Sequence, residues 1–348
     1  MSAARSQRRD RRSRNQTRDT APFNADALRG VDTVIIDIGD TLVATGRAYT
    51  KATRTFYDGL RKETRLSMDE VADGLRHLRN QEFLALPYGL NQHPGLREKF
   101  PTGDLVEQFA PLRQRTFQEF MDRSQADRDT VDFLKRLKKQ GTKVIFMTSL
   151  PESAARFVIQ GAGLSGLADK TYAAMDIEQD PALADGQAAN STPLNDSLGG
   201  GTDEPIVILD PELDVKQQLA AVMDAEGAQP ASTLRIADNR RKDIAPANEL
   251  GLRTALMTGH RDRTDDKFLR AMRELRQGTG EVQPPYVLPH PPRYQASRDH
   301  EAADYVIHTS KQMHGAAYHL ETGKAHPAAT TAKTTEVTAT PPRTGLTG

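Results

Sequence analysis

The stretch Val34-Ile35-Ile36-Asp37-Ile38-Gly39-Asp40-Thr41-Leu42 decides how the rest of the chain is interpreted. It begins as an apolar run typical of a buried strand and ends in two carboxylates beside a flexible glycine. Two later apolar runs, 144–148 and 234–238, also end on polar residues, Thr148 and Asp238. Because ligands bind at the carboxyl ends of strands in open α/β sheets, these three strand ends predict one polar site.

Strand and helix patterns alternate along most of the chain after residue 126. Apolar runs predict strands, and runs with three- and four-residue apolar spacing predict helices between them. Such alternation is typical of a parallel sheet with helices on both faces. We therefore predict a three-layer, Rossmann-like α/β core over residues 30–43 and 126–315. The predicted strands are 32–38, 142–148, 170–175, 206–209, 233–237, 254–257 and 305–307, and the helices are 127–140, 152–162, 213–226 and 242–250.

The first strand is followed by a helical block, residues 44–125, with no strand pattern of its own. Amphipathic spacing predicts helices at 47–64, 67–85 and 104–122. Pro, Gly and Asn are frequent from 87 to 103, which predicts a loop there. The sequence therefore predicts an inserted α-helical domain after the first strand.

Three further segments have compositions that do not support a packed core. Residues 1–29 are an Arg-rich tail and residues 316–348 a Thr/Ala/Pro-rich tail, and we expect both to be disordered. Residues 176–204 form an acidic insertion with a run of glycines, expected to be irregular and on the surface. A solvated tail is favoured for the N-terminal arginines, and contact with nucleic acid is the alternative, although no aromatic residues interleave with them.

The overall composition excludes several classes of protein. The 47 basic residues balance the 47 acidic ones, so a wholly basic nucleic-acid binder is not indicated. No cysteine is present, which excludes disulfides and thiolate chemistry and fits the reducing cytoplasm. No apolar run approaches the roughly 20 residues that span a bilayer, so we expect no membrane association.

Residues 32–313 resemble the haloacid dehalogenase-like (HAD) hydrolase superfamily, in a form with a helical cap after the first strand. Four motifs in order carry the resemblance. The first is Ile35-Ile36-Asp37-Ile38-Gly39-Asp40-Thr41-Leu42, and the second is the strand that ends on Thr148. The third is a lysine before a helix, matched best by Lys216, with Lys170 as the alternative. The fourth is the pair Asp238 and Asp243, followed by Gly251.

The resemblance implies phosphoryl transfer through an aspartyl-phosphate on Asp37, a carboxylate that can attack phosphorus. It also implies a Mg²⁺ ion, which prefers oxygen ligands. Thr148 would donate a hydroxyl hydrogen bond to the phosphoryl group, and Lys216 would add positive charge. The expected partner is a small phosphorylated molecule. The implied metal ligands are Asp37, the backbone carbonyl of Gly39 and Asp238, supported by Asp243.

The first motif departs from the family pattern at Gly39, where phosphatases of this superfamily usually have a second Asp. That residue serves as general acid and then as general base, a contribution of about 10²–10⁴-fold in rate. Asp40 follows one residue later and is the candidate substitute. Three interpretations stay open: Asp40 replaces the acid in part, the substrates have good leaving groups, or the protein binds phosphate and metal without turnover. Haloacid dehalogenation needs no such acid, but Asp40 and Thr41 are more similar to the phosphatase motif.

Overall fold

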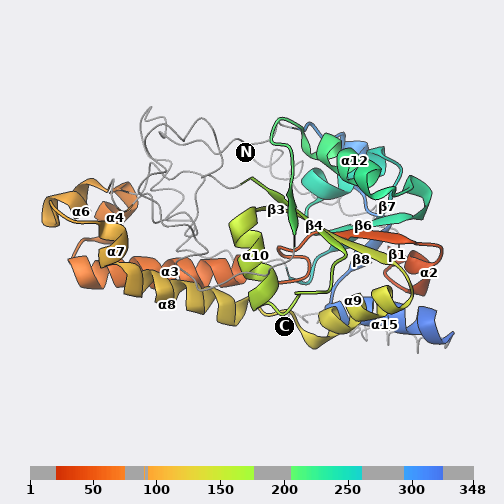
Figure 1. Cartoon of the computed structure of the whole chain (residues 1–348), viewed down its shortest axis with the longest axis horizontal. Helices are drawn as coiled ribbons and strands as arrows, with labels where there is room; N and C mark the ends of the chain where they lie inside the picture. Colours follow the sequence, from red (N-terminus) through yellow and green to blue (C-terminus); the bar gives the residue numbers. More distant parts are fainter. Residues whose placement is uncertain (1–20, 75–89, 91–92, 176–204, 261–293, 324–348) are drawn as a thin grey trace, which may run out of the picture.

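A computed structural model of the chain describes residues 21–74, 90, 93–175, 205–260 and 294–323 (Figure 1). The N-terminal arginines before residue 21, the end of the helix predicted at 67–85, the acidic insertion 176–204 and the tail after residue 323 lie outside these ranges.

The centre of the described structure is one sheet of eight parallel strands in the order β1-β8-β7-β6-β2-β3-β4-β5. The first strand of the main motif, β2, lies between β3 and β6, so the three predicted strand ends are neighbours. The strands are β1 (Ala21–Pro22), β2 (Thr33–Ile36), β3 (Lys143–Pro151), β4 (Lys170–Ala174), β5 (Ile206–Ile208), β6 (Thr233–Ala237), β7 (Arg253–Met257) and β8 (Tyr305–Ile307).

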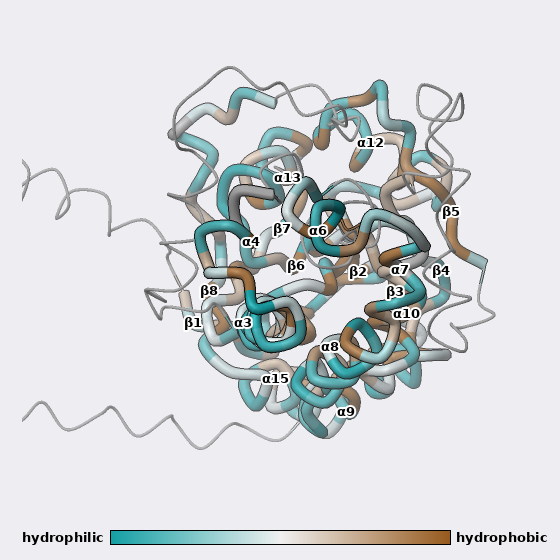
Figure 2. The backbone as a smooth tube through the Cα atoms, turned by 90° about the vertical axis from the view of Figure 1, so that its left-hand side faces the viewer, coloured by the Kyte–Doolittle hydropathy of each residue, from teal (hydrophilic) through white to brown (hydrophobic). Residues whose placement is uncertain are grey.

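Helices cover both faces of this sheet, which confirms the predicted three-layer α/β fold. Side chains alternate between the faces of a strand, and in β2 both faces are apolar because Ile35 and Ile36 belong to separate buried clusters. Ile36 shares its cluster with α9 (Arg128–Lys139) and α15 (Ser310–Thr322). Ile35 shares the other with α12 (Val215–Glu226) and α13 (Ala245–Glu249). Figure 2 shows the hydrophobic stretches gathered around the central strands.

The chain between β2 and α9 forms helices and no strand in its described part. They are α3 (Thr45–Thr64), α4 (Met68–Gly74), α6 (Pro94–Lys99), α7 (Leu105–Gln108) and α8 (Ala110–Arg123). The long helices α3 and α8 pack against each other and extend away from the sheet (Figure 1). α10 (Glu152–Gly161), which follows β3, contacts this block through Phe157, whose ring centroid lies 5.8 Å from that of Phe117 on α8. None of the described helices is long and apolar enough to cross a membrane.

The helical block differs from the prediction in two places. Residues 94–99, predicted as loop, form α6, because Pro94 occupies the first turn and the His93 ring accepts a hydrogen bond from the Leu96 amide (3.2 Å). The predicted helix 104–122 is divided at Phe109 into α7 and α8. Proline and asparagine near residue 94 favoured a loop by composition, but a capped proline also starts a helix.

Both predicted tails include residues that form secondary structure. Residues 21–29, assigned to the N-terminal tail, form β1 and the short helix α2 (Ala25–Leu28). The reason is a local apolar group: Phe23 and Leu28 are buried, and the Phe23 ring lies edge-on to Tyr305 of β8 at 6.2 Å. At the other end, α15 continues to Thr322 because Ala316 and Ala317 pack into the core, and alanine favours helix.

We expect Phe23→Ala to lower the free energy of unfolding by about 3 kcal/mol, since it removes a buried aromatic side chain that holds β1 on the sheet. Urea unfolding followed by circular dichroism measures this change. Arg29→Ala, which removes an exposed ion pair with Asp26, is the control and should cost less than about 1 kcal/mol. An equally small effect for Phe23→Ala would show that this segment contributes no stability.

Candidate functional site

Asp37 and Asp238 lie next to each other in space because their strands are paired in register. Thr33 to Ile36 of β2 align with Thr233 to Ile236 of β6. Asp37 directly follows β2, and its amide donates to the Ile236 carbonyl (3.0 Å). Asp238 directly follows β6 at the same edge of the sheet. The two carboxylates that the sequence placed at separate strand ends therefore share one edge.

The third carboxylate, Asp243, is brought to the same place by one wide turn. Asn239 caps this turn, the π-helix η6 (Arg240–Ile244), by accepting from the amides of Arg241 and Lys242 (3.1 Å each). The Asp243 amide in turn donates to the Asn239 carbonyl (3.0 Å). The spacing of five residues between Asp238 and Asp243 is thus the spacing that closes this turn.

The Asp37 carboxyl has an unusual electrostatic environment. Burial, followed by the charge of Asp243, raises its pKa well above the usual range, and Asp238 adds to this effect. Arg235 and a hydrogen bond from the Thr41 hydroxyl (3.1 Å) act in the opposite direction. Burial and the neighbouring carboxylates disfavour the ionised form of Asp37. A cation bound at this place would stabilise that ionised form.

Arg235 is the functional residue that the sequence analysis missed. It lies within β6, pairs with Ile35 in register, and its side chain is only 2% exposed. Its guanidinium forms an ion pair with Asp243. The signal in the sequence was a charged residue at the centre of an apolar strand run, Leu234-Arg235-Ile236, which is rare unless the charge is paired.

The loop after β2 directs Asp40 toward the start of α3. Asp40 adopts a left-handed conformation (φ 52°), which a short polar residue tolerates better than most. Its carboxylate accepts a hydrogen bond from the Gly46 amide (2.7 Å), and its own amide donates to the Thr45 hydroxyl (3.2 Å). Asp40 thereby joins the first motif to the helical block. In this conformation its carboxylate binds the first turn of α3, whose N-cap residue is Ala44.

Gly39 leaves little room for a side chain but does not exclude one. A Cβ atom placed there would lie 3.1 Å from the hydroxyl oxygen of Thr45. That neighbour is a side-chain atom that rotation can move, so an aspartate at this position requires adjustment of Thr45 only.

Thr148, the residue predicted to contact a phosphoryl group, lies on β3, the strand next to β2. Thr148 is buried, two residues past Phe146, the partner of Ile36, and its hydroxyl accepts from the Leu150 amide (3.2 Å). β3 continues to Pro151, so Thr148 lies within the strand and not at its end.

Neither predicted lysine contacts the carboxylate cluster. Lys216, in the first turn of α12, forms an ion pair with Glu249 of α13 (2.9 Å). Lys170 begins β4, two strands away from β2, and its charge acts on Glu226 at the end of α12. The cation that acts on Asp37 is Arg235.

The donor set fits one hard divalent cation by its chemistry. Asp37, Asp238 and Asp243 carry three negative charges against the single charge of Arg235, and carboxylate oxygens suit Mg²⁺. In the described part of the chain no three acidic or histidine side chains are arranged as a ready metal site.

His260 is a second residue near the first motif that the sequence analysis did not select. It follows β7 at the same edge of the sheet. Burial lowers its pKa, although the charges of Asp127 and Asp40 and the backbone of Thr41 act in the opposite direction. Asp127 caps α9 and accepts from Thr130 and Ser310. The His260 ring thus lies beside the loop that carries Asp40.

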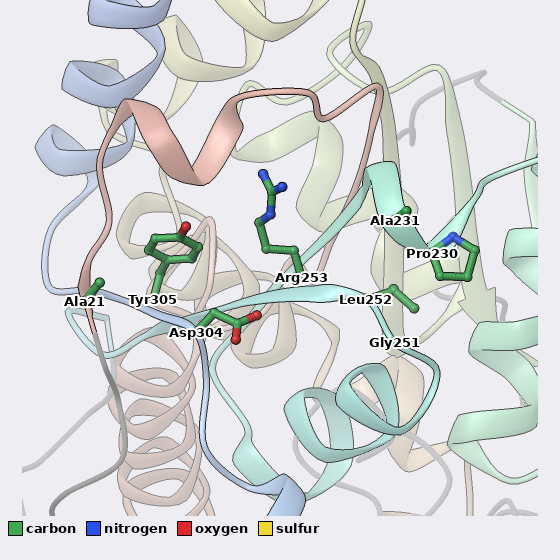
Figure 3. Close-up of a pocket in the computed structure, with 8 residues that line it drawn as sticks. All are labelled: Ala21, Pro230, Ala231, Gly251, Leu252, Arg253, Asp304 and Tyr305. Atoms are coloured by element: carbon green, nitrogen blue, oxygen red, sulfur yellow. The ribbon is translucent and has the colours of Figure 1, made fainter.

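A shallow cavity of about 500 Å³ lies at the other end of the sheet (Figure 3). It is lined by residues at the amino ends of β1, β6, β7 and β8. Its charged residues are already bound within the fold. Arg253 points toward α2 and donates to the carbonyls of Ala27 and Arg29, and Asp304 accepts from the Thr254 amide. The cavity therefore has no counterpart of the charge cluster around Asp37.

Comparisons with known proteins give matches among solved structures alone. No family model and no curated protein matches the sequence. The chain is similar to a 2-haloacid dehalogenase from Pseudomonas syringae pv. Tomato DC3000 (15% identity, TM-score 0.43, 81% of this chain and 96% of that one). It is also similar to a HAD phosphatase from Thermococcus onnurineus (16%, 0.42, 84% and 96%). A third is the HAD-hydrolase YfnB from Bacillus subtilis, bound to magnesium (15%, 0.37, 65% and 88%). The solved structures that the chain resembles are thus of the HAD type.

Asp37→Asn should raise the stability of the metal-free protein at neutral pH. A carboxyl whose folded pKa lies above its unfolded value costs stability once it ionises, and this cost disappears as the pH falls through the folded pKa toward the unfolded value of about 3.9. The difference between Asp37→Asn and wild type should therefore shrink on acidification. Urea unfolding in EDTA at a series of pH values measures it, with Asp224→Asn on the surface of α12 as the control for net charge. A less stable Asp37→Asn protein at neutral pH would contradict the assignment.

Asp40→Ala should cost about 2 kcal/mol of stability and Asp40→Gly about 1 kcal/mol less. Both variants lose the hydrogen bond to the first turn of α3, but alanine also keeps a Cβ atom in the left-handed region, where glycine has none. Equilibrium unfolding of the two variants tests this order. Equal stabilities would show that the left-handed turn is not retained in solution.

Proposed function

We propose that the protein is a Mg²⁺-dependent phosphatase of the HAD type that acts on a small phosphorylated molecule. The observation that carries the proposal is the charge cluster at the carboxyl edge of β2 and β6. It combines a buried carboxylate, Asp37, with Asp238, Asp243 and the guanidinium of Arg235. Phosphoryl transfer depends mainly on positioning and on neutralising charge, and a rigid strand end with this charge pattern provides both.

In this proposal an oxygen of the Asp37 carboxylate attacks phosphorus and forms an aspartyl-phosphate, while the bond between phosphorus and the leaving oxygen breaks. The leaving oxygen takes the electron pair, and in an alkyl ester it would also need a proton. Water then attacks the phosphorus of the intermediate, which releases inorganic phosphate and restores Asp37. The hydrogen bond from Thr41 fixes the orientation of the Asp37 carboxylate for attack. When bound, Mg²⁺ would neutralise phosphate oxygens, held by Asp37, Asp238 and the Gly39 carbonyl.

The first motif lacks the usual donor of a proton to the leaving oxygen. Gly39 has no side chain, and Asp40 is engaged at the start of α3. We therefore propose that the substrates are those whose leaving group needs no protonation, such as acyl phosphates. A carboxylate leaving group departs as an anion, so the missing acid costs little there.

A second candidate is an HAD-fold protein that binds phosphate and metal with little or no turnover. The engagement of Asp40 at the start of α3 favours it, because it leaves the first motif without a visible general acid. The two candidates differ in whether acyl phosphates are hydrolysed.

The test is hydrolysis of acetyl phosphate and of an alkyl phosphate monoester by the purified protein with Mg²⁺. We expect acetyl phosphate to be hydrolysed at a rate that Asp37→Asn abolishes. Gly39→Asp should raise the alkyl ester rate about 10-fold, a fraction of the usual contribution of a general acid, while Gly39→Asn, of similar shape but without an acid, should not. If wild type hydrolyses neither compound above the Asp37→Asn level, the enzymatic proposal fails and the binding protein is favoured.

A further inference from the structure

The feature that the proposed function leaves unexplained is the arginine within the central strand β6. Arginine is almost never fully buried without a partner, and the side chain of Arg235 is 2% exposed. Arg235 and Ile35 are partners in the ladder, so their side chains lie on the same face of the sheet. Asp37 follows Ile35 on that face, roughly 7 Å further along the strand. A long arginine side chain spans such a distance, and that of Arg235 does reach Asp243.

The hydrogen bonds of Arg235 indicate that its charge matters more than its donors. One nitrogen, Nη2, binds Asp243. Nε and Nη1 are buried and find no acceptor in the described part of the chain. Ordered water can complete such donors. Asp243 binds one nitrogen of the guanidinium, and the charge of Arg235 also acts on Asp37.

The lysines predicted for the charge role are engaged elsewhere. Lys216 forms its ion pair with Glu249 on the outer helices, and the charge of Lys170 acts on Glu226 at the end of α12. The fixed positive charge next to the carboxylate cluster therefore comes from a strand.

We propose that Arg235 is a positioning residue of this site, which holds Asp243 in place and supplies the fixed charge that keeps Asp37, Asp238 and Asp243 together. This inference rests on the proposed function for its catalytic consequence but not for the charge coupling itself. A strand arginine thus replaces the helix lysine expected from the sequence.

The direct test is a double-mutant cycle on the full chain, by urea unfolding at pH 7.5 in EDTA. Arg235→Met removes the charge, and Asp37→Asn removes the carboxylate that the charge offsets. If Arg235 serves the whole cluster, the decrease in the folding equilibrium constant caused by Arg235→Met will be at least 10-fold smaller in the Asp37→Asn background than in wild type. Arg253→Met on the neighbouring strand, whose guanidinium binds α2, is the matched control and should add to Asp37→Asn without coupling. Additive effects of Arg235→Met and Asp37→Asn would overturn the inference, since an arginine that holds Asp243 alone would give that result.

Arg235→Lys keeps the experiment decisive if Arg235→Met does not fold alone. Lysine retains the charge, so the effect of Asp37→Asn in the Arg235→Lys background should match that in wild type. Folding of Arg235→Met only in combination with Asp37→Asn would also support the inference. An effect of Asp37→Asn that differs between Arg235→Lys and wild type by more than 10-fold in the folding constant would contradict it.

The catalytic consequence is measured with acetyl phosphate and Mg²⁺. Arg235→Met should lower kcat at least 10-fold with KM within about 3-fold of wild type, and Arg235→Lys should recover part of kcat, because the guanidinium orients carboxylates and does not touch the substrate. A raised KM with kcat unchanged would overturn the positioning role. No hydrolysis by wild type would refute the proposed function alone, because the double-mutant cycle needs no substrate and still decides the role of Arg235.

Discussion

Three carboxylates and one guanidinium share the carboxyl edge of β2 and β6, and most of the structure around the site follows from keeping them there. Like charges at short range repel, and burial strengthens the repulsion because water is excluded. The arrangement therefore needs rigid attachment and a countercharge. The paired strands fix Asp37 and Asp238, the wide turn η6 fixes Asp243, and Arg235 supplies the charge from within β6. The result is a carboxylate, Asp37, whose ionisation is disfavoured by the fold and favoured by a bound cation.

The loop from Gly39 to Thr45 links this cluster to the helices that extend from the sheet. Asp40 uses its carboxylate and a left-handed backbone to begin α3. His260, from the end of β7, lies beside the same loop. Any movement of the helical block relative to the sheet would act first on these contacts. Asp40, which the sequence offered as a substitute for the missing acid, thus binds the start of α3. The first motif therefore carries two carboxylates, of which only Asp37 belongs to the charge cluster.

The sequence predicted those parts that depend on periodicity and on local chemistry. Apolar runs such as Ile35-Ile36 have a local signature, so the parallel sheet and the shared edge of Asp37 and Asp238 could be predicted, whereas Asp243 was selected only through the family resemblance. The roles of Lys216 and Asp40 could not be, because each depends on a partner distant in sequence or on one torsion angle: Glu249 lies 33 residues beyond Lys216, and Asp40 turns at φ 52°. Arg235 lies in a predicted strand, and its charge within an apolar run indicated a paired role, but its partner Asp243 could be identified only from the structure. The same applies to Phe23, whose burial depends on Tyr305 at the far end of the chain.

The central claim is that Asp37 is a phosphoryl acceptor whose carboxylate neighbours hold a magnesium ion. A crystal structure of the protein grown with Mg²⁺ and beryllium trifluoride, a mimic of the phosphoryl group on aspartate, tests it most directly. The account predicts beryllofluoride bonded to an Asp37 carboxylate oxygen, with Mg²⁺ on the other oxygen, on Asp238 and on the Gly39 carbonyl, and with the Arg235–Asp243 ion pair intact. Beryllofluoride on another residue, or a metal ion that does not contact Asp37, would contradict it.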